Sequence, residues 1–416
     1  MLEYNISMYA REIESRIKHI SETFKVLVVT GPRQVGKTTL LESMMPESMT
    51  KVSLDDEVLR EEAKNNPQFF LDTYKAPLFI DEVQYAPQLL PYIKMRVDSS
   101  DEKSQYWLSG SQAFNLMEGV SESLAGRAGI VEMNSFTFRE SSRILNQTAI
   151  FDPSQYTNSS PISTDEVFNQ IFMGGMPELY NTPNISRDDF FRSYINTYIQ
   201  RDVRQIKNIG SVEDFRRFMK DIALRNGKPL NYSDIAAEIG VSSVTVKTWI
   251  SVLVTSGIIT LLEPFYTKQL KRLTHMSEII FMDSGLASYL AGFDSAFGLQ
   301  SSEYAGSFLE AYIVSELIKG YHNNGMQTNF TYIRNKETEE IDLLIERDLI
   351  LHPFEIKKTS NPKREMLKNF HMLDNTNIKV GAGGLICLYD KLMPLDDKNY
   401  ILPISSVIAP IQKPLK

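Results

Sequence analysis

The chain has 416 residues, of which 42% are hydrophobic and 23% charged, which predicts a globular protein of two or three domains and excludes a disordered chain. The net charge of −8 excludes a generally basic nucleic-acid coat but is compatible with a local basic patch. No apolar run approaches the ~18 residues that span a bilayer, and the N-terminus shows no apolar signal segment, so we expect no membrane insertion.

The first 140 residues alternate short apolar runs with helix-compatible sequence. Continuous β-branched runs of this kind are typical of strands that are buried on both faces. Their alternation with helices predicts an α/β domain with a parallel sheet. The runs predicted as strands are KVLVVTG (25–31), MTKVSLDD (49–56), APLFIDE (76–82), QYWLSGS (105–111) and GIVEMNSF (129–136).

A phosphate-binding motif joins the first predicted strand to a helix. Residues 31–38 read GPRQVGKT and fit G-x-x-x-x-G-K-[ST] in the strand–loop–helix context that this motif requires. Its backbone N–H groups surround phosphate oxygens at a helix N-terminus, Lys37 reaches the β- and γ-phosphates, and Thr38 joins a Mg²⁺ shell. The residues predicted to bind nucleotide here are Gly31, Pro32, Arg33, Gln34, Val35, Gly36, Lys37, Thr38 and Thr39. For Arg33, a contact with phosphate and a contact with a sheet-edge acid both stay open.

A pair of acids supplies the second half of a nucleotide site. Asp81 and Glu82 end the apolar run LFIDE. An acid at the C-terminal end of a buried parallel strand lies beside the phosphate loop. We expect Asp81 to hold Mg²⁺ and Glu82 to polarise the attacking water, because general-base catalysis needs a carboxylate within hydrogen-bond reach. Two solvated acids at a strand end are the simpler alternative.

Taken in order, these motifs resemble the bacterial and archaeal AAA-type ATPases that carry a C-terminal domain of unknown function. The resemblance rests on GPRQVGKTTLL, LFIDEVQ, YWLSGSQ and SLAGRAGIVEMNSFTFRE, and it continues through GGMPEL, YINTYIQRDV, FMDSGLASYL and EIDLLIE with FEIKK, so it covers nearly the whole chain. It implies a P-loop NTPase sheet of the AAA type followed by a helical lid.

The resemblance implies roles for three further residues. Ser111 would be a sensor of the γ-phosphate, although a small polar residue at a strand end is equally typical of a plain turn. Arg127 would reach a phosphate, in its own chain or in a neighbouring subunit, and its alternative is a surface arginine in a glycine-rich loop. Pro177, in GGMPEL, would pack near the adenine as in signalling-type ATPases.

Residues 145–163 are rich in Asn, Ser, Thr and Pro and predict a loop, and residues 164–225 predict a helical lid. Residues 228–283 then predict a helix, a tight turn, a helix and strands. Ser233 is expected to cap the first helix, and Ser242 or Ser243 the second. The apolar face of the second helix carries Val246, Trp249, Ile250 and Leu253.

This winged-helix pattern has two interpretations. A helix-turn-helix usually places its second helix in a DNA major groove, and the basic stretch 267–275 lies where a wing would contact phosphates. Against this, Lys247 is the one basic residue between 241 and 263. The alternative is a module that packs on the ATPase as a lid.

The C-terminal part places charged residues on apolar strands. Alternation along a strand predicts that Asp342, Leu344 and Glu346 share one face, with Ile341, Leu343 and Ile345 on the other, and that Glu355 and Lys357 point the same way. A cation bound by Asp342 and Glu355 would offset the cost of burying them. With Glu310 on a preceding helix, the order of elements is similar to the PD-(D/E)xK nuclease fold of the Holliday-junction-resolvase type. That likeness implies an Mg²⁺-dependent site of Glu310, Asp342, Glu355 and Lys357. Solvated acids beside a surface lysine pair are the plainer alternative.

We therefore predict four domains: a P-loop ATPase core (1–145), a linker and helical lid (146–225), a winged-helix module (226–295) and an α/β nuclease-like domain (296–416). The predicted function is ATP hydrolysis with Mg²⁺ that drives or switches the C-terminal module, acting on DNA. The alternative is a nucleotide-dependent regulatory switch whose inactive nuclease-like domain binds a protein partner, and a third possibility is a module in which ATP is structural. Expected partners are ATP and ADP, DNA, and a second copy or another protein. The single cysteine, Cys387, permits no intrachain disulfide and indicates a reducing cytoplasm.

Overall fold

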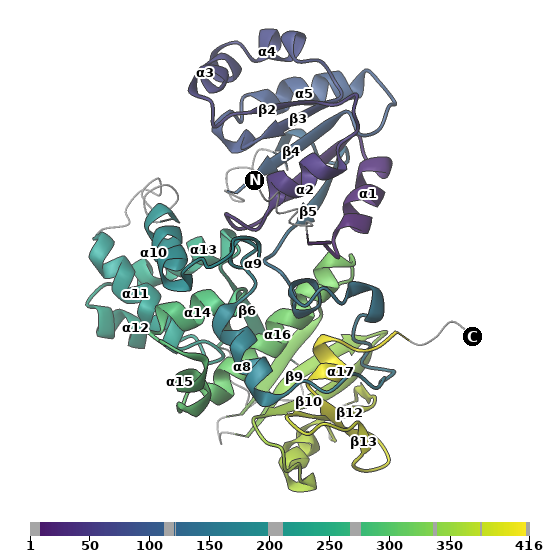
Figure 1. Cartoon of the computed structure of the whole chain (residues 1–416), viewed down its shortest axis with the longest axis vertical. Helices are drawn as coiled ribbons and strands as arrows, with labels where there is room; N and C mark the ends of the chain where they lie inside the picture. Colours follow the sequence, from purple (N-terminus) through teal and green to yellow (C-terminus); the bar gives the residue numbers. More distant parts are fainter. Residues whose placement is uncertain are drawn as a thin grey trace.

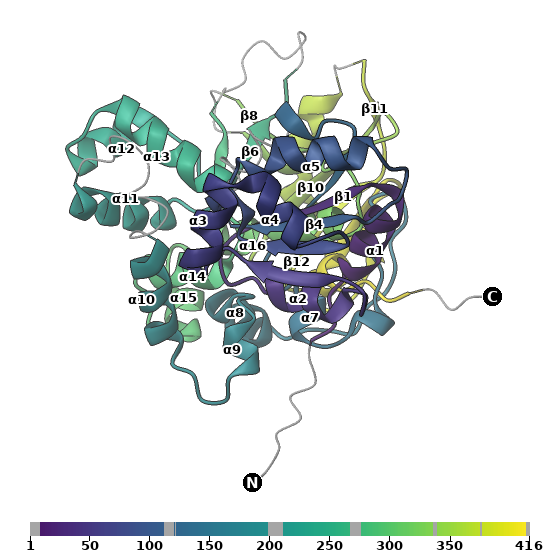
Figure 2. The same ribbon diagram turned by 90° about the horizontal axis from the view of Figure 1, so that it is seen from above.

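The computed structural model describes residues 9–111, 120, 122–198, 211–266, 276–335, 339–374 and 377–412. Figure 1 shows the N-terminal α/β domain at the top and a second sheet, with its own helices, at the bottom. Figure 2 looks at the same ribbon from above and shows α11 (Val212–Leu224), α12 (Tyr232–Ile239) and α13 (Ser243–Thr255) grouped to one side of the N-terminal domain.

The N-terminal sheet has five parallel strands in the order β2-β3-β4-β1-β5. They are β1 (Val26–Thr30), β2 (Thr50–Ser53), β3 (Leu78–Asp81), β4 (Tyr106–Gly110) and β5 (Ala128–Glu132). The helices around them are α1 (Glu14–Thr23), α2 (Lys37–Met44), α3 (Glu57–Asn65), α4 (Pro67–Thr73) and α5 (Leu89–Asp98). All five predicted strands are confirmed. Every residue of β1, β3 and β4 is buried, because helices cover both faces of the sheet.

A helical region follows the first sheet. After α7 (Phe138–Ser141) and a 3₁₀ turn (Leu145–Gln147), no helix or strand occurs before α8 (Thr164–Met173), in agreement with the loop predicted for 145–163. The chain continues through α9 (Glu178–Asn181), α10 (Arg187–Tyr198) and α11.

The two helices of the predicted helix-turn-helix are α12 and α13. The cap prediction for α12 is wrong: Asn231, and not Ser233, accepts hydrogen bonds from the N–H groups of Ser233 (3.0 Å) and Asp234 (3.4 Å). Asn231 wins because it is the last residue with an extended backbone, so its side chain faces the unpaired N–H groups of the first turn. Ser242 caps α13, as one of the two predicted candidates. The four apolar residues predicted to share a face of α13 are all buried.

The second sheet is mixed and runs in the order β13-β14-β12-β10-β9-β8-β6-β7, with β11 beside β10. Its strands are β6 (Ile259–Pro264), β7 (Glu278–Phe281), β8 (Phe330–Arg334), β9 (Glu340–Arg347), β10 (Ile350–Lys357), β11 (Lys379–Val380), β12 (Gly383–Cys387), β13 (Met393–Pro394) and β14 (Asn399–Pro403). β6 pairs with both β7 and β8. Strands that precede the boundary predicted at residue 296 and strands that follow it therefore belong to one sheet. The helices of this half are α14 (Ser284–Leu290), α15 (Ala296–Ser301), α16 (Ala305–Asn323), a 3₁₀ helix (Arg364–Leu373) and α17 (Ser405–Ile408).

The predicted alternation of faces along β9 is wrong. Ile341 pairs with Ile333 and Leu344 with Thr331, so two residues of β9 lie opposite one residue of β8. This is a β-bulge, and it flips the faces that follow it. Ile341 and Leu344 consequently pack in one small cluster, whereas Leu343 and Ile345 belong to the main core with α16.

No single helix among the described residues is both long and apolar enough to cross a membrane. The pair α12 and α13 meets that test of length and composition only when taken together, and the two helices are bent by 107° at their junction.

We expect Asn231→Ala to lower the free energy of unfolding by about 1 kcal/mol, because it removes the side-chain cap of α12. Urea denaturation followed by tryptophan fluorescence measures the change, since Trp249 is buried in the neighbouring helix α13 and Trp107, in the N-terminal sheet, is the same in every variant. Ser233→Ala is the matched control and should be within about 0.5 kcal/mol of the wild type. The reverse order of the two variants would contradict the assignment of the cap.

Candidate nucleotide site and C-terminal carboxylate site

The phosphate loop lies between β1 and α2, as predicted. A Cβ on Gly31 would lie 2.0 Å from the carbonyl oxygen of Met133, so only glycine fits at this position. Gly36 has φ 88° and starts α2 in the left-handed region. Lys37 is buried along the loop, where its Nζ donates to the carbonyl oxygens of Gly31 (2.9 Å) and Pro32 (2.7 Å).

Asp81 lies beside the start of α2. The Oγ1 of Thr38 donates to its carboxylate, at 3.1 Å from Oδ1 and 3.0 Å from Oδ2. Ser109, at the end of β4, donates to Oδ1 as well. A threonine hydroxyl next to a carboxylate is an oxygen donor set that suits Mg²⁺. The structure thus brings together the two residues predicted as metal ligands of the nucleotide site.

Glu82 directly follows β3 and has a left-handed backbone, with φ 56°. Its Oε2 accepts hydrogen bonds from Ser111 Oγ (3.3 Å) and from the amide of Gln84. Ser111 therefore contacts the glutamate, a partner that the sequence did not predict for it. Gln84 was missed altogether. The signal for it was its place two residues after the acid pair in DEVQ, which keeps its amide on the same turn.

Of the residues that the resemblance implies for the nucleotide site, Pro177 lies beside the phosphate loop and Arg127 lies away from it. The ring of Pro177 lies against the phosphate loop, with its Cγ 4.0 Å from the place that a Cβ on Gly36 would occupy. Arg127 precedes β5 at the N-terminal edge of the sheet and pairs with Asp98 (Nη2 to Oδ2, 3.1 Å). The phosphate loop is at the opposite edge, so Arg127 cannot reach it within one chain. A role toward a neighbouring subunit stays a prediction.

Arg11 is a buried contact of the phosphate loop that sequence reasoning missed. Its guanidinium donates to the carbonyl oxygens of Val35 (2.9 Å) and Asn134 (2.8 Å) and to Oε1 of Glu140 (3.0 Å). It therefore ties the loop to the segment that follows β5. No motif marks an arginine so far upstream of the loop.

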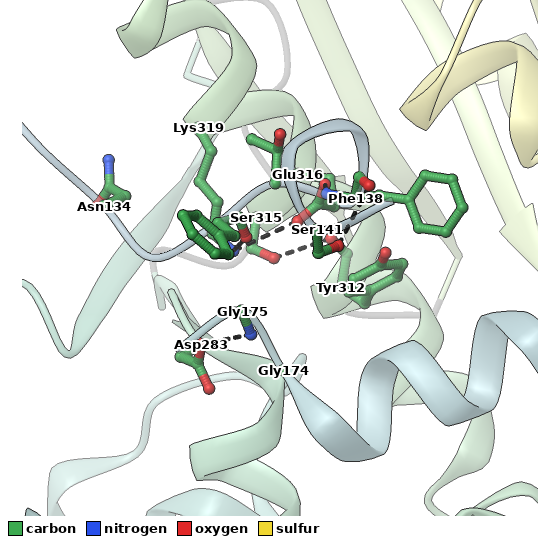
Figure 3. Close-up of polar contacts among 12 residues, drawn as sticks. Asn134, Phe138, Ser141, Gly174, Gly175, Asp283, Tyr312, Ser315, Glu316 and Lys319 are labelled. Carbon is green, nitrogen blue, oxygen red and sulfur yellow. Dashed lines mark hydrogen bonds and ion pairs between the residues drawn. The ribbon is translucent and has the colours of Figure 1, made fainter. Parts of the chain in front are cut away.

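That same segment meets the C-terminal half through a buried polar cluster (Figure 3). Glu316 of α16 accepts a hydrogen bond from the N–H of Phe138 at 2.6 Å. Lys319 donates to the carbonyl oxygen of Phe136 at 3.2 Å and to Glu316 at 3.3 Å. Burial raises the pKa of Glu316, and the positive charge of Lys319 offsets only part of this effect. The backbone of residues 136–138, which follow the N-terminal sheet, is thus hydrogen-bonded to side chains of α16.

The predicted C-terminal site residues gather where β9 and β10 separate. The pairing of these strands ends at Leu343 and Phe354. Beyond it, Asp342 Oδ2 accepts from the backbone N–H of Ile356 (2.7 Å). The Nζ of Lys357 lies 2.9 Å from Asp342 Oδ2 and 2.7 Å from Glu355 Oε1. The bulge in β9 and the end of its pairing with β10 leave the Asp342 carboxylate room to hydrogen-bond the backbone of β10.

Burial dominates the electrostatics of this cluster. Burial, and after it the charge of Asp342, raises the pKa of Glu355 to about 8, and the charge and hydrogen bond of Lys357 oppose this rise. Burial and the charge of Asp342 also hold the pKa of Glu310, on α16, well above its ordinary value. For Lys357, burial lowers the pKa but the two carboxylates outweigh it and raise it. The Oε2 of Glu355 is buried and has no hydrogen-bond partner within the described ranges.

Two more acids, Glu278 and Glu340, adjoin this site and were missed by the sequence. Burial, followed by the charge of Glu340, raises the pKa of Glu278 to about 9, although Arg334 lies 3.4 Å away. Across the part of the chain that the structure describes, no three His, Cys, Asp or Glu side chains converge to hold a metal ion. Glu310 therefore does not complete a set of three carboxylate ligands. The residues that fit a cation are Asp342 and Glu355, because the Oε2 of Glu355 has no hydrogen-bond partner among the described residues.

The surface predicted to bind DNA is sparsely charged. Val244 on α13 is 73% exposed, and Lys247 is exposed beside it. The basic stretch 267–275 lies outside the described residues. After α13, Gly257 packs on the phosphate loop, where an added Cβ would lie 3.0 Å from Pro32 Cγ. This contact agrees with the alternative that the module covers the ATPase.

Three family models match consecutive parts of the chain. Residues 23–142 match a model described as an AAA domain. Residues 164–296 and 305–407 match two models described as domains of unknown function, DUF8612 and DUF4143. An AAA domain is thus followed by two domains of unknown function, and the AAA domain implies nucleotide binding.

Similar proteins span most of the chain. The uncharacterized protein Rv2008c of Mycobacterium tuberculosis is 24% identical over 401 residues, which are 96% of this chain and 84% of that protein. A Walker-type ATPase of Pyrococcus abyssi is 15% identical with a TM-score of 0.43, over 69% of this chain and 97% of that chain. The RuvB Holliday junction branch migration motor of Thermotoga maritima is 18% identical with a TM-score of 0.29, over 60% of this chain and 88% of that chain.

We expect Glu278→Gln to gain stability relative to the wild type as the pH rises. A carboxyl whose pKa is raised by folding stabilises the fold fully below its ordinary pKa of 4.5, and this contribution declines until the pH passes about 9. The glutamine does not titrate, so the melting temperature of the variant minus that of the wild type should increase by about 2 °C or more from pH 6 to pH 9. Glu303→Gln, at an exposed site, is the control. A difference that stays constant over this range would contradict the raised pKa.

Proposed function

We propose that the protein hydrolyses ATP at the loop 31–38, with Mg²⁺ held by Thr38 and Asp81. The observation that carries this proposal is the contact between the Thr38 hydroxyl and the Asp81 carboxylate, at 3.0 and 3.1 Å. It joins the start of α2 to the end of β3, which is where a triphosphate and its metal meet in P-loop proteins. When bound, Mg²⁺ neutralises charge that develops on the phosphate oxygens.

The residues of the loop have distinct roles in this proposal. The backbone N–H groups at the start of α2 bind phosphate oxygens. The Lys37 ammonium, which the carbonyls of Gly31 and Pro32 hold at the loop, exchanges these partners for β- and γ-phosphate oxygens. Glu82 takes a proton from the attacking water. Pro177 packs against the nucleotide from the lid, and the γ-phosphate is assigned to Arg33, within the loop, and to Ser111, which contacts Glu82.

The contacts between the halves support a switch that responds to the nucleotide. Arg11 connects the phosphate loop to residues 134–140. Glu316 and Lys319 connect that segment to α16, which also carries Glu310 of the carboxylate site. Since packed interfaces of this kind adopt discrete arrangements, a change at the loop on nucleotide binding can alter how α16 sits against the ATPase core.

We expect Lys37→Ala to lose nucleotide binding and Glu82→Gln to keep it while hydrolysis falls at least about 100-fold. Nucleotide affinity by calorimetry and phosphate release by the purified protein measure the two effects. Glu57→Gln, on the exposed start of α3, is the control and should behave like the wild type. A wild type that binds ATP without releasing phosphate would replace the ATPase proposal with a structural nucleotide.

A second candidate function is metal-dependent cleavage of phosphodiesters by Asp342, Glu355 and Lys357. The observation that favours it is the buried, unpaired Oε2 of Glu355 beside a lysine that already bridges both acids. In such sites two carboxylates hold the cation and the lysine orients water or a phosphate oxygen. The substrate that we predict for this second function is DNA.

We expect Mg²⁺-dependent nicking of supercoiled DNA by the wild type and its loss in Asp342→Ala, because the variant lacks one of the two metal ligands. Gel electrophoresis with and without chelator reads the result. Asp348→Asn, at the exposed hairpin turn of the same strand pair, is the matched control. Should the wild type leave duplex, single-stranded and branched DNA intact, the alternative of a switch with an inactive nuclease-like domain would stand.

A further inference from the structure

Gln84 is a buried polar residue that the proposed roles leave unexplained. It lies in the 3₁₀ turn Val83–Tyr85, two residues beyond Glu82, and only 6% of it is exposed. Its amide N–H donates to Oε2 of Glu82. Its own amide oxygen is buried and has no hydrogen-bond partner among the described residues. The orientation of the amide is set by charge, because turning it over would place two oxygens against each other.

Glu82 is held in one orientation from two sides. Its Oε2 accepts from both Gln84 and Ser111, so a single carboxylate oxygen takes both donors. The backbone of Glu82 is also left-handed, a conformation that non-glycine residues adopt rarely and that clusters at functional sites. The other oxygen, Oε1, accepts no side-chain hydrogen bond recorded in the described part of the chain, which leaves it available as a base.

We infer that Gln84 positions Glu82 for catalysis and that its free amide oxygen accepts a hydrogen bond from the attacking water. This inference rests on the proposed function of the nucleotide site. A glutamine amide suits the task because it carries donors and an acceptor on one group. The amide nitrogen of Gln84 restrains the Glu82 carboxylate, and its amide oxygen orients the water. Glu82 and Gln84 thus act on the same attacking water.

The chemical step is ATP hydrolysis. The water oxygen forms a bond to the γ-phosphorus while the bond from that phosphorus to the oxygen bridging it to the β-phosphorus breaks. One water proton passes to Oε1 of Glu82, and the second is the one that hydrogen-bonds to the Gln84 amide oxygen. ADP and inorganic phosphate leave, and Glu82 returns its proton to solvent. Gln84 exchanges no proton in this scheme and acts through hydrogen bonds alone.

The test compares Gln84→Met, which keeps the length of the side chain without its hydrogen bonds, with Gln88→Met, an exposed glutamine four residues later. Full-length proteins are assayed for phosphate release and for ATP affinity. We expect kcat of Gln84→Met to fall about 10- to 100-fold, with ATP affinity and melting temperature unchanged. Gln88→Met should match the wild type. Gln84→Glu, which keeps size and polarity but loses the donor, should be similarly slow.

A double-mutant comparison separates positioning from simple packing. In the Glu82→Gln background, Gln84→Met should have little further effect on the residual single-turnover rate, because both changes remove the same contribution. Additive effects, or a Gln84→Met variant as fast as the wild type, would overturn the inference while leaving the ATPase proposal intact. Equal losses of ATP affinity and kcat would assign Gln84 a structural role and overturn it as well. Failure of the wild type to release phosphate would instead remove the proposed function itself.

Discussion

The contact of Thr38 with Asp81 is the constraint on which the nucleotide site depends. A helix start and the end of a strand two places away in the sheet meet only because the strands are parallel and their carboxyl ends share one edge. Ser109, from the strand between them, donates to the same carboxylate and fixes its position. The steric exclusion of any side chain at Gly31 fixes the loop beside this edge. The ATPase chemistry proposed for Glu82 and Gln84 requires this arrangement first.

The segment after β5, residues 134–140, connects the N-terminal domain to the C-terminal half. It receives Arg11 from the side of the phosphate loop and Glu316 with Lys319 from α16. Most of these hydrogen bonds end on backbone groups, so they depend on the path of the chain and only weakly on which side chains the segment carries. Buried charges of this kind are costly unless each is paired, and here each is. An interface built from paired buried charges adopts few intermediate arrangements, as the proposed nucleotide-dependent switch requires.

The C-terminal half solves a different electrostatic problem. Asp342 and Glu355 lie where β9 and β10 separate, Glu278, Glu310 and Glu340 act on them from neighbouring elements, and Lys357 and Arg334 are the basic side chains paired with this group. The fold responds by raising the pKa of Glu278, Glu310 and Glu355. Whether Asp342 and Glu355 bind a cation is what the proposed cleavage experiment tests.

The parallel sheet, the phosphate loop and the acid pair are predictable from the sequence, because local spacing and hydrophobic runs encode strand ends and loop geometry directly. It also indicated Glu355 and Lys357 as neighbours, since alternation holds along an unbroken strand. Three features emerge only from the folded chain: the bulge that breaks this alternation in β9, the pairing of Arg127 with Asp98, and the partners of Arg11 and Glu316. These features depend on contacts between residues far apart in the chain, which no local pattern specifies.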